Sequence, residues 1–116
     1  MAMSPTARSL DALRKAGYRA AVVERYNAFS RMRVDLFGIF DIVAIGQGRI
    51  LFVQTTTAGN MASRRTKMLG ADNGAILAEL AAVPGAVVEL HGCVKRGRRW
   101  ECKREILVPV LGELAA

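Results

Sequence analysis

The alternation of apolar and polar residues predicts a chain that mixes helices and strands. Ser4-Pro5 is a typical helix start, and the apolar stripe that follows it predicts a helix ending at Gly17. A second apolar stripe predicts a helix over Ala71–Ala82, and Asn60–Leu69 is a shorter, basic helix. β-branched and aromatic runs predict strands at Tyr18–Tyr26, Phe37–Ile45, Ile50–Thr55, Ala86–Val94 and Trp100–Val108, with a basic loop over Asn27–Asp35. The expected order is α-β-β-β-α-α-β-β, an α/β domain.

The segment Phe37–Ile45 is apolar on both of its alternating faces, which is typical of a strand buried between two layers. A tight turn centred on Gln47 and Gly48 follows it, so a hairpin is the simplest connection to the next strand. This turn fixes the pairing of the two strands and places Asp41 opposite Gln54.

Asp41 is an acid within an otherwise apolar strand. An unpaired, ionised carboxylate there would cost several kcal/mol, so a cation, a basic partner or a raised pKa must compensate it. A divalent metal would do so most completely. Thr56 lies on the same face as Asp41 and Gln54, because strand side chains alternate. The alternative is a buried Asp41–Gln54 hydrogen bond that only fixes the register.

Length and composition limit the architecture and the environment. A chain of 116 residues that is 52% hydrophobic is one domain, residues 1–116, and is not disordered. No apolar stretch approaches the ~20 residues of a membrane-spanning helix, and the N-terminus lacks the apolar segment of a signal peptide. We therefore expect a cytoplasmic protein without a membrane partner. Cys93 and Cys102 face each other across a Gly97-Arg98 turn and are expected to be reduced thiols.

The positive charge is concentrated in one part of the chain. Seventeen Lys and Arg residues outnumber ten Asp and Glu, giving a net charge of +7, and residues 1–70 hold 11 of the basic but only 4 of the acidic residues. This distribution favours a polyanionic partner such as nucleic acid or anionic lipid. A carboxylate repels phosphate, so the four acids in this part require another role: Asp11, Glu24, Asp35 and Asp41.

The strand containing Asp41, the tight hairpin, and the second strand ending Phe52-Val53-Gln54-Thr55-Thr56 resemble the core of the PD-(D/E)XK nuclease superfamily. The resemblance is strongest to small Holliday-junction-resolvase-like proteins of phages and prokaryotes, and it covers Leu10 to Leu80. It implies a restriction-endonuclease-like fold, with a central mixed sheet in αβββαβ order flanked by helices. It also implies a Mg²⁺-dependent (or Mn²⁺-dependent) DNA endonuclease.

The resemblance assigns roles to residues of the hairpin. Asp41 matches the first metal-binding acid, and Gln54 stands where the family has a glutamate. Thr55 would supply a backbone carbonyl to the metal, and Thr56 replaces the lysine that orients or deprotonates the attacking water. Lys67 or Arg64, three residues apart on the following helix, could take the place of that lysine.

Other residues around this hairpin could complete a site. Glu24 or Asp35 could be a further acid, although Glu24 could equally be an edge charge beside Arg25, and Asp35 a turn residue. Asn60 could cap the basic helix. The candidate phosphate contacts, with solvated surface charge as the alternative, are Arg31, Arg33, Arg64, Arg65 and Lys67.

The expected function is metal-dependent phosphodiester hydrolysis on DNA, including branched or junction DNA, without a small-molecule cofactor. Cutting two strands needs two sites, so we expect a C2 homodimer, with Leu111–Ala116 as a contact surface. One alternative is a DNA-binding protein of the same fold that has lost hydrolysis. Another is a small assembly protein whose charge neutralises a polyanion.

Overall fold

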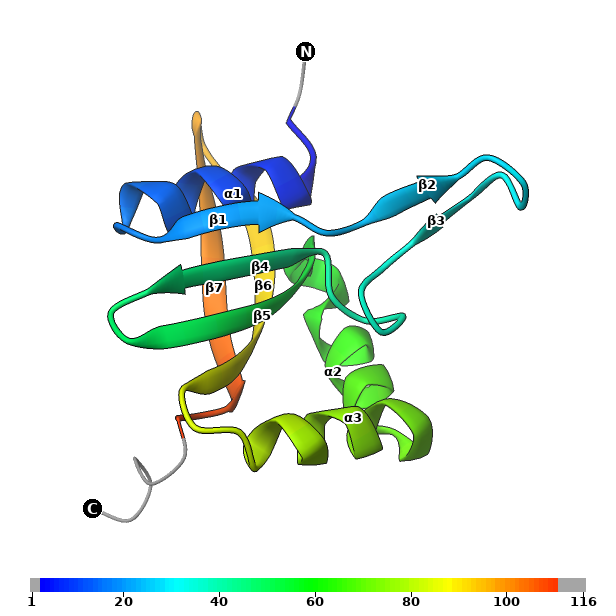
Figure 1. The fold of residues 1–116 in the computed structure, drawn as a ribbon. Helices are drawn as coiled ribbons and strands as arrows, with labels where there is room; N and C mark the ends of the chain where they lie inside the picture. The colour runs from blue at the N-terminus through cyan, green and yellow to red at the C-terminus, as the bar shows by residue number, and fades with distance from the viewer. Residues whose placement is uncertain (1–2, 111–116) are drawn as a thin grey trace.

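The computed structural model describes residues 3–110 and shows a mixed α/β architecture with a five-stranded mixed sheet and three α-helices (Figure 1). The helices are α1 (Pro5–Lys15), α2 (Met61–Leu69) and α3 (Ala71–Ala81), and a 3₁₀ turn η1 (Ala58–Asn60) precedes α2. The strands are β1 (Arg19–Val22), β2 (Arg25–Asn27), β3 (Met32–Val34), β4 (Ile42–Gly46), β5 (Arg49–Thr57), β6 (Ala86–Arg96) and β7 (Arg99–Val108). The predicted α/β class is confirmed.

The main sheet has the strand order β1-β4-β5-β6-β7, in which β5 and β6 run parallel and the other neighbours antiparallel. The β4–β5 hairpin has the predicted register, with Ile45 opposite Ile50. Gln47 and Gly48 both have positive φ, 55° and 74°, which is the backbone of a type I′ turn. The residue pair that set the predicted register is therefore confirmed as the turn.

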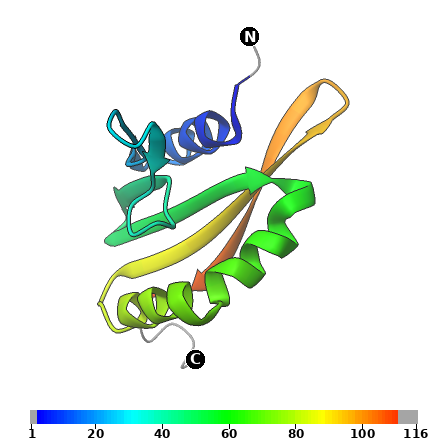
Figure 2. The same cartoon turned by 90° about the vertical axis from the view of Figure 1, so that its right-hand side faces the viewer.

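Helices cover both faces of this sheet (Figure 2). On one face α1 packs Leu13 against Ile42, Leu51 and Val53. On the other face α2 and α3 pack over Phe40 and Leu90, among other residues of the second core. No helix among residues 3–110 is long and apolar enough to cross a membrane.

The predicted strand Tyr18–Tyr26 and loop 27–35 are wrong in part. The main-sheet strand β1 ends at Val22, and β2 then leaves the sheet to pair with β3 in a separate hairpin, which we call the arm (residues 25–34). The Asn27 side chain accepts hydrogen bonds from the backbone N–H groups of Phe29 and Ser30, at 2.9 and 3.3 Å. This Asx turn reverses the chain between β2 and β3. Because the segment is polar, its composition predicted a loop and not a hairpin.

The strand predicted at Phe37–Ile45 begins later, at Ile42. Phe37 and Gly38 have φ of 57° and 72°, and the Gly38 N–H donates to the Asp35 carbonyl at 2.9 Å. These left-handed residues form a turn that brings the chain back from the arm. The bounds of the other elements lie within two residues of the predicted ones. β5 and β6 each extend two residues further toward the C-terminus than predicted.

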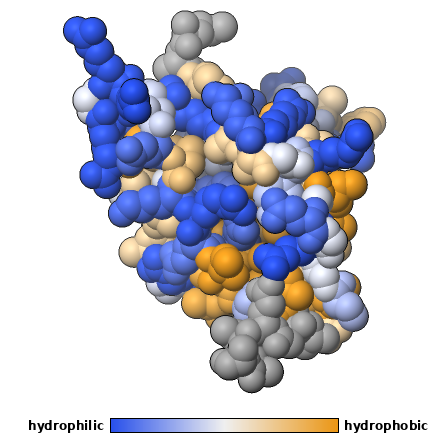
Figure 3. All heavy atoms as spheres, turned by 90° about the vertical axis from the view of Figure 1, so that its left-hand side faces the viewer, coloured by the Kyte–Doolittle hydropathy of each residue, from blue (hydrophilic) through white to orange (hydrophobic). Residues whose placement is uncertain are grey.

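Cys93 and Cys102 are paired across β6 and β7, as the predicted turn requires, but they form a disulfide rather than reduced thiols. Directly opposed residues on neighbouring antiparallel strands bring their Cβ atoms close enough for this bond. The end of this hairpin stands out from the body in Figure 2, and Figure 3 shows hydrophilic side chains over it. Those residues include Lys95, Arg96 and Arg98.

Candidate metal and phosphate site

Asp41 lies immediately before β4 and is 5% exposed. Its Oδ2 atom accepts three hydrogen bonds: from the Thr55 backbone N–H at 2.8 Å, from Thr55 Oγ1 at 3.0 Å and from Gln54 Nε2 at 3.0 Å. The hairpin register brings Gln54 and Asp41 together, as predicted. Neutral donors thus partly compensate the charge of the buried Asp41 carboxylate. The predicted hydrogen bond between Gln54 and Asp41 is present.

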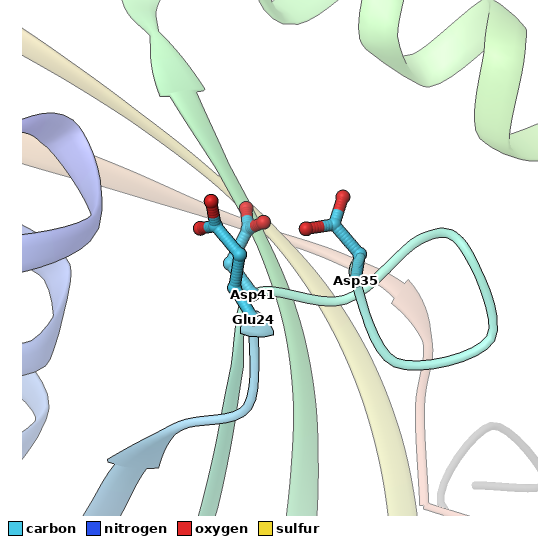
Figure 4. Close-up of side chains that lie close together, drawn as sticks. All are labelled: Glu24, Asp35 and Asp41. Atoms are coloured by element: carbon cyan, nitrogen blue, oxygen red, sulfur yellow. The ribbon is translucent and has the colours of Figure 1, made fainter. Parts of the chain in front are cut away.

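Two further carboxylates approach Asp41. Oxygens of Glu24, Asp35 and Asp41 all lie within 4.8 Å of one another. Figure 4 shows the three side chains reaching the same space from separate segments of the chain. Glu24 lies between β1 and β2, and Asp35 directly follows β3, so the two ends of the arm deliver one acid each. The structure therefore places both of the additional acids proposed from the sequence beside Asp41.

The environment of Asp41 disfavours its charge. Burial raises the pKa of Asp41 from its ordinary value of 3.8 to about 6, although the backbone hydrogen bond from Thr55 acts in the opposite direction. The negative charge of Asp35 raises this pKa further. Gathering like charges beside a buried carboxylate is costly unless a cation joins them.

The cluster opens into a groove with a volume of about 360 Å³. Besides the three acids, the groove is lined by Arg33 and Arg64 and by the end of β5. Arg33 Nη1 forms an ion pair with Glu24 Oε1 at 3.0 Å. Thr6, in the first turn of α1, shares a 2.7 Å hydrogen bond with Thr55 across the groove wall. Acidic and basic side chains thus lie together in an open, polar groove.

The predicted metal-binding residues on β5 are all at this groove, but their contacts differ in detail. Gln54 Nε2 donates to the Thr55 carbonyl at 3.2 Å as well as to Asp41. The N–H₂ group of Gln54 therefore contacts Asp41 Oδ2 and the Thr55 carbonyl oxygen, the two oxygens that were expected to bind a metal together with the Gln54 side chain. Thr56, the predicted substitute for a lysine, is buried and lines the groove. The direct contact of Thr55 with Asp41 was missed, because simple alternation puts neighbouring side chains on opposite faces.

The predicted basic residues divide into groups. Arg33 and Arg64 line the groove. Arg65 instead forms a two-bond ion pair with Glu105 on β7, at 2.7 and 2.6 Å. Lys67 is exposed on α2, and Arg31 lies at the end of the arm with φ of 55°. Of the two residues predicted to replace a lysine, Arg64 is at the groove and Lys67 is not among the lining residues.

Asn60 does precede α2, but its side chain makes no capping hydrogen bond. Ser63 Oγ donates instead to the Asn60 carbonyl at 3.0 Å. The predicted cap is therefore wrong, because the 3₁₀ turn ahead of α2 already continues into the helix.

A second charged cluster lies between β6 and β7 and was not foreseen. Glu89 and His91 are buried, His91 Nε2 lies 2.8 Å from Glu89 Oε1, and Arg104 donates two hydrogen bonds to Glu89 at 2.8 and 2.9 Å. Burial alone would raise the pKa of Glu89, but the bonds from His91 and Arg104 outweigh it and lower the pKa to about 2. In the sequence, only the even spacing of Glu89 and His91 on one strand face gave a signal.

The donor set at the groove suits a hard divalent cation. Carboxylate oxygens are the ligands that Mg²⁺ and Mn²⁺ prefer, and a Mg²⁺ ion needs only one or two of them because it keeps several waters. Three carboxylates from separate segments, one of them buried, meet that requirement.

Comparisons of the chain with protein-family models, with curated proteins and with solved structures find no match.

Proposed function

We propose that this protein is a metal-dependent DNA endonuclease with a restriction-endonuclease-like core, similar to the PD-(D/E)XK nucleases. The observation that carries the proposal is the meeting of Glu24, Asp35 and Asp41 within 4.8 Å, in a groove that two arginines also line. A net charge of +7 supports a polyanionic substrate. The helix before the β1-β4-β5 meander and the helices between β5 and β6 agree with the αβββαβ order.

Asp41 would be the principal metal ligand, and Glu24 and Asp35 would complete the charge. In this proposal the Thr55 carbonyl and the Gln54 Oε1 atom would be supporting ligands. Gln54 would have to turn its amide group to do so, because its Nε2 atom donates to Asp41 and to the Thr55 carbonyl. A bound Mg²⁺ or Mn²⁺ supplies Lewis-acid polarisation of the phosphate and lowers the pKa of a coordinated water.

The protein's own cations would hold the substrate. Arg64, on α2, and Arg33, on β3, both line the groove. A guanidinium can donate two hydrogen bonds to a phosphate, which fixes the DNA backbone against the carboxylates. Thr56 cannot act as a general base or carry charge, so Arg64 takes the electrostatic part of the missing lysine's role.

Nicking of supercoiled DNA by the purified protein tests this proposal. We expect cleavage with Mg²⁺ or Mn²⁺, no cleavage with EDTA, and a loss of at least about 100-fold in Asp41→Asn, as for other groups that stabilise a transition state directly. Glu24→Gln and Asp35→Asn should each reduce the rate. The matched control is Glu79→Gln on the exposed side of α3, which should cleave like the wild type.

A second candidate function is DNA binding without hydrolysis on the same fold. It is favoured by two observations: Thr56 occupies the lysine position, and the Gln54 N–H₂ group rather than its oxygen contacts Asp41. Salt-sensitive DNA binding without metal-dependent nicking would support this candidate over the nuclease. Equal, weak affinity for any polyanion would instead favour the assembly protein.

The homodimer is part of the proposal, because one chain carries one cluster of this kind among its described residues. Two-strand cleavage or junction resolution would then need two copies related by C2 symmetry. The contact surface predicted at Leu111–Ala116 lies outside the described residues. Sedimentation of the protein with and without branched DNA measures the number of copies directly.

A further inference from the structure

The arm is a two-stranded hairpin that extends away from the main sheet (Figure 1). Its register pairs Tyr26 with Arg33 and Asn27 with Met32. A two-stranded hairpin with no second layer gains little stability from burial. The arm is therefore a candidate binding element rather than part of the core.

The charge of the arm has one sign. Residues 25–34 contain Arg25, Arg31 and Arg33 and no acidic residue. Such a segment attracts a polyanion. A symmetric contact between the arms of two copies would instead bring these like charges together, which argues against a second copy as its partner.

The arm also exposes aromatic rings. Phe29, at its end, is 102% exposed, and Tyr26 is 64% exposed. Exposed rings interleaved with arginines are typical of surfaces on which unpaired bases stack, because every base has a π-face. In a duplex the bases are already stacked on each other and present only their edges.

A hollow of about 530 Å³ runs along the arm from its base to its end and is lined by Tyr26, Phe29 and Phe37, with Arg25 and Asp35 among the other lining residues. Its volume lies within the range of pockets that take small organic ligands, about 300–1,000 Å³. Asp35 also lines the acidic groove, so the aromatic hollow and the groove share a wall.

The geometry points to a site for an unpaired nucleotide: its base stacks in the aromatic hollow of the arm, and its phosphate lies toward the acidic groove. The inference deepens the proposed function and rests on it, because it takes the polyanion to be DNA. It assigns a substrate class, DNA with unpaired nucleotides next to a duplex, as at a branch, flap or bulge. Arg25 and Arg31 contact the flanking backbone.

Binding is measured by fluorescence anisotropy in EDTA, apart from any cleavage. The probes are a fully paired duplex, the same duplex with a short bulge that contains 2-aminopurine, and the bulged duplex with an abasic site in its place. We expect the wild type to bind the bulged duplex about tenfold more tightly than the paired one, the effect of one base–aromatic stack. Stacking should also quench the 2-aminopurine fluorescence.

Phe29→Ala and Tyr26→Ala should each lose most of that preference and of the quenching, while binding of the paired duplex changes less than about twofold, as expected for loss of a stack rather than of charge. Tyr26→Phe keeps the ring and should behave as the wild type. The control is Ile106→Ala, an exposed apolar residue on the edge strand β7, at the other side of the main sheet from β1.

Three results would overturn the inference: equal affinity of the wild type for the paired and bulged probes, an equal loss on all probes in the arm variants, or conversion of a dimer to a monomer by Phe29→Ala. The last would identify the arm as a self-contact. Cleavage is scored separately. Nicking without a bulge preference refutes only this inference, whereas a bulge preference without nicking refutes only the nuclease.

Discussion

Replacing Asp41 with asparagine should make the metal-free protein more stable at neutral and alkaline pH. The Asp41 carboxylate is buried and lies beside Asp35. An asparagine Oδ1 can accept the hydrogen bonds from Thr55 and Gln54, and its Nδ2 can donate to the neighbouring carboxylates. The substitution therefore keeps the shape of the side chain and removes the unfavourable charge.

The size of the effect follows from the pKa of Asp41, which rises from 3.8 to about 6. At about 1.4 kcal/mol for each tenfold change in proton affinity, this corresponds to about 3 kcal/mol. Because the folded-state pKa lies above the unfolded value, the folded protein holds a proton that the unfolded chain releases. Stability is therefore lost as pH rises from about 4 to about 6, and the full cost persists above that window.

Urea unfolding of the wild type and D41N in EDTA measures this cost. The stability of D41N relative to the wild type should increase by up to about 3 kcal/mol between about pH 4 and pH 8. Glu79→Gln, at an exposed position, should show a difference of no more than about 0.5 kcal/mol throughout. A D41N difference that does not change with pH, or lower stability of D41N at pH 8, would refute the electrostatic argument.

Three further predictions concern other parts of the molecule. Glu89→Gln should lower the free energy of unfolding by up to about 3 kcal/mol at neutral pH. The wild type should lose this stabilisation as pH falls from 4.5 to about 2, because the folded-state pKa of Glu89 lies below its ordinary value. Denaturant unfolding across that pH range measures both effects, and a difference that does not change with pH would contradict the prediction. Cys102→Ser should lower the free energy of unfolding by about 2–3 kcal/mol, the loop-closure effect for residues nine apart. A reductant should destabilise the wild type but not the variant. Equal sensitivity of the two proteins to reductant would exclude the disulfide as the cause. Arg64→Ala should reduce the rate of DNA cleavage about 10- to 100-fold, because Arg64 is proposed to contact phosphate. The Mn²⁺ affinity, measured by calorimetry, should stay within about twofold. A parallel loss of metal affinity would show that Arg64 supports the carboxylates instead.

The sequence predicted those parts of the fold that local chemistry determines. Positive φ at Gln47 and Gly48 is what a two-residue hairpin turn requires, so the register that joins Asp41 and Gln54 could be read from the chain. The arm could not, because the run Tyr18–Tyr26 has strand propensity throughout and gives no sign that it changes partners after Val22. The change of partner from β4 to β3 depends on which strand lies close enough to form backbone hydrogen bonds, and the tertiary structure decides this.

The candidate site shows the same division. Asp41 was evident as an acid within an apolar stretch of the sequence. The approach of Glu24 and Asp35 depends on the arm leaving the sheet and returning to it, so sequence spacing suggested each residue only as an option. The contact between Thr55 and Asp41 depends on a backbone N–H at the end of β5, which residue patterns do not reveal.

The most direct test of the central claim is the anomalous scattering of Mn²⁺ in crystals of the protein soaked in that ion. We expect a Mn²⁺ peak within about 2–2.5 Å of an Asp41 carboxylate oxygen, with Glu24 or Asp35 as a further ligand, and the loss of this peak in D41N crystals. Occupied Mn²⁺ sites elsewhere on the protein, with none at these three carboxylates, would contradict it.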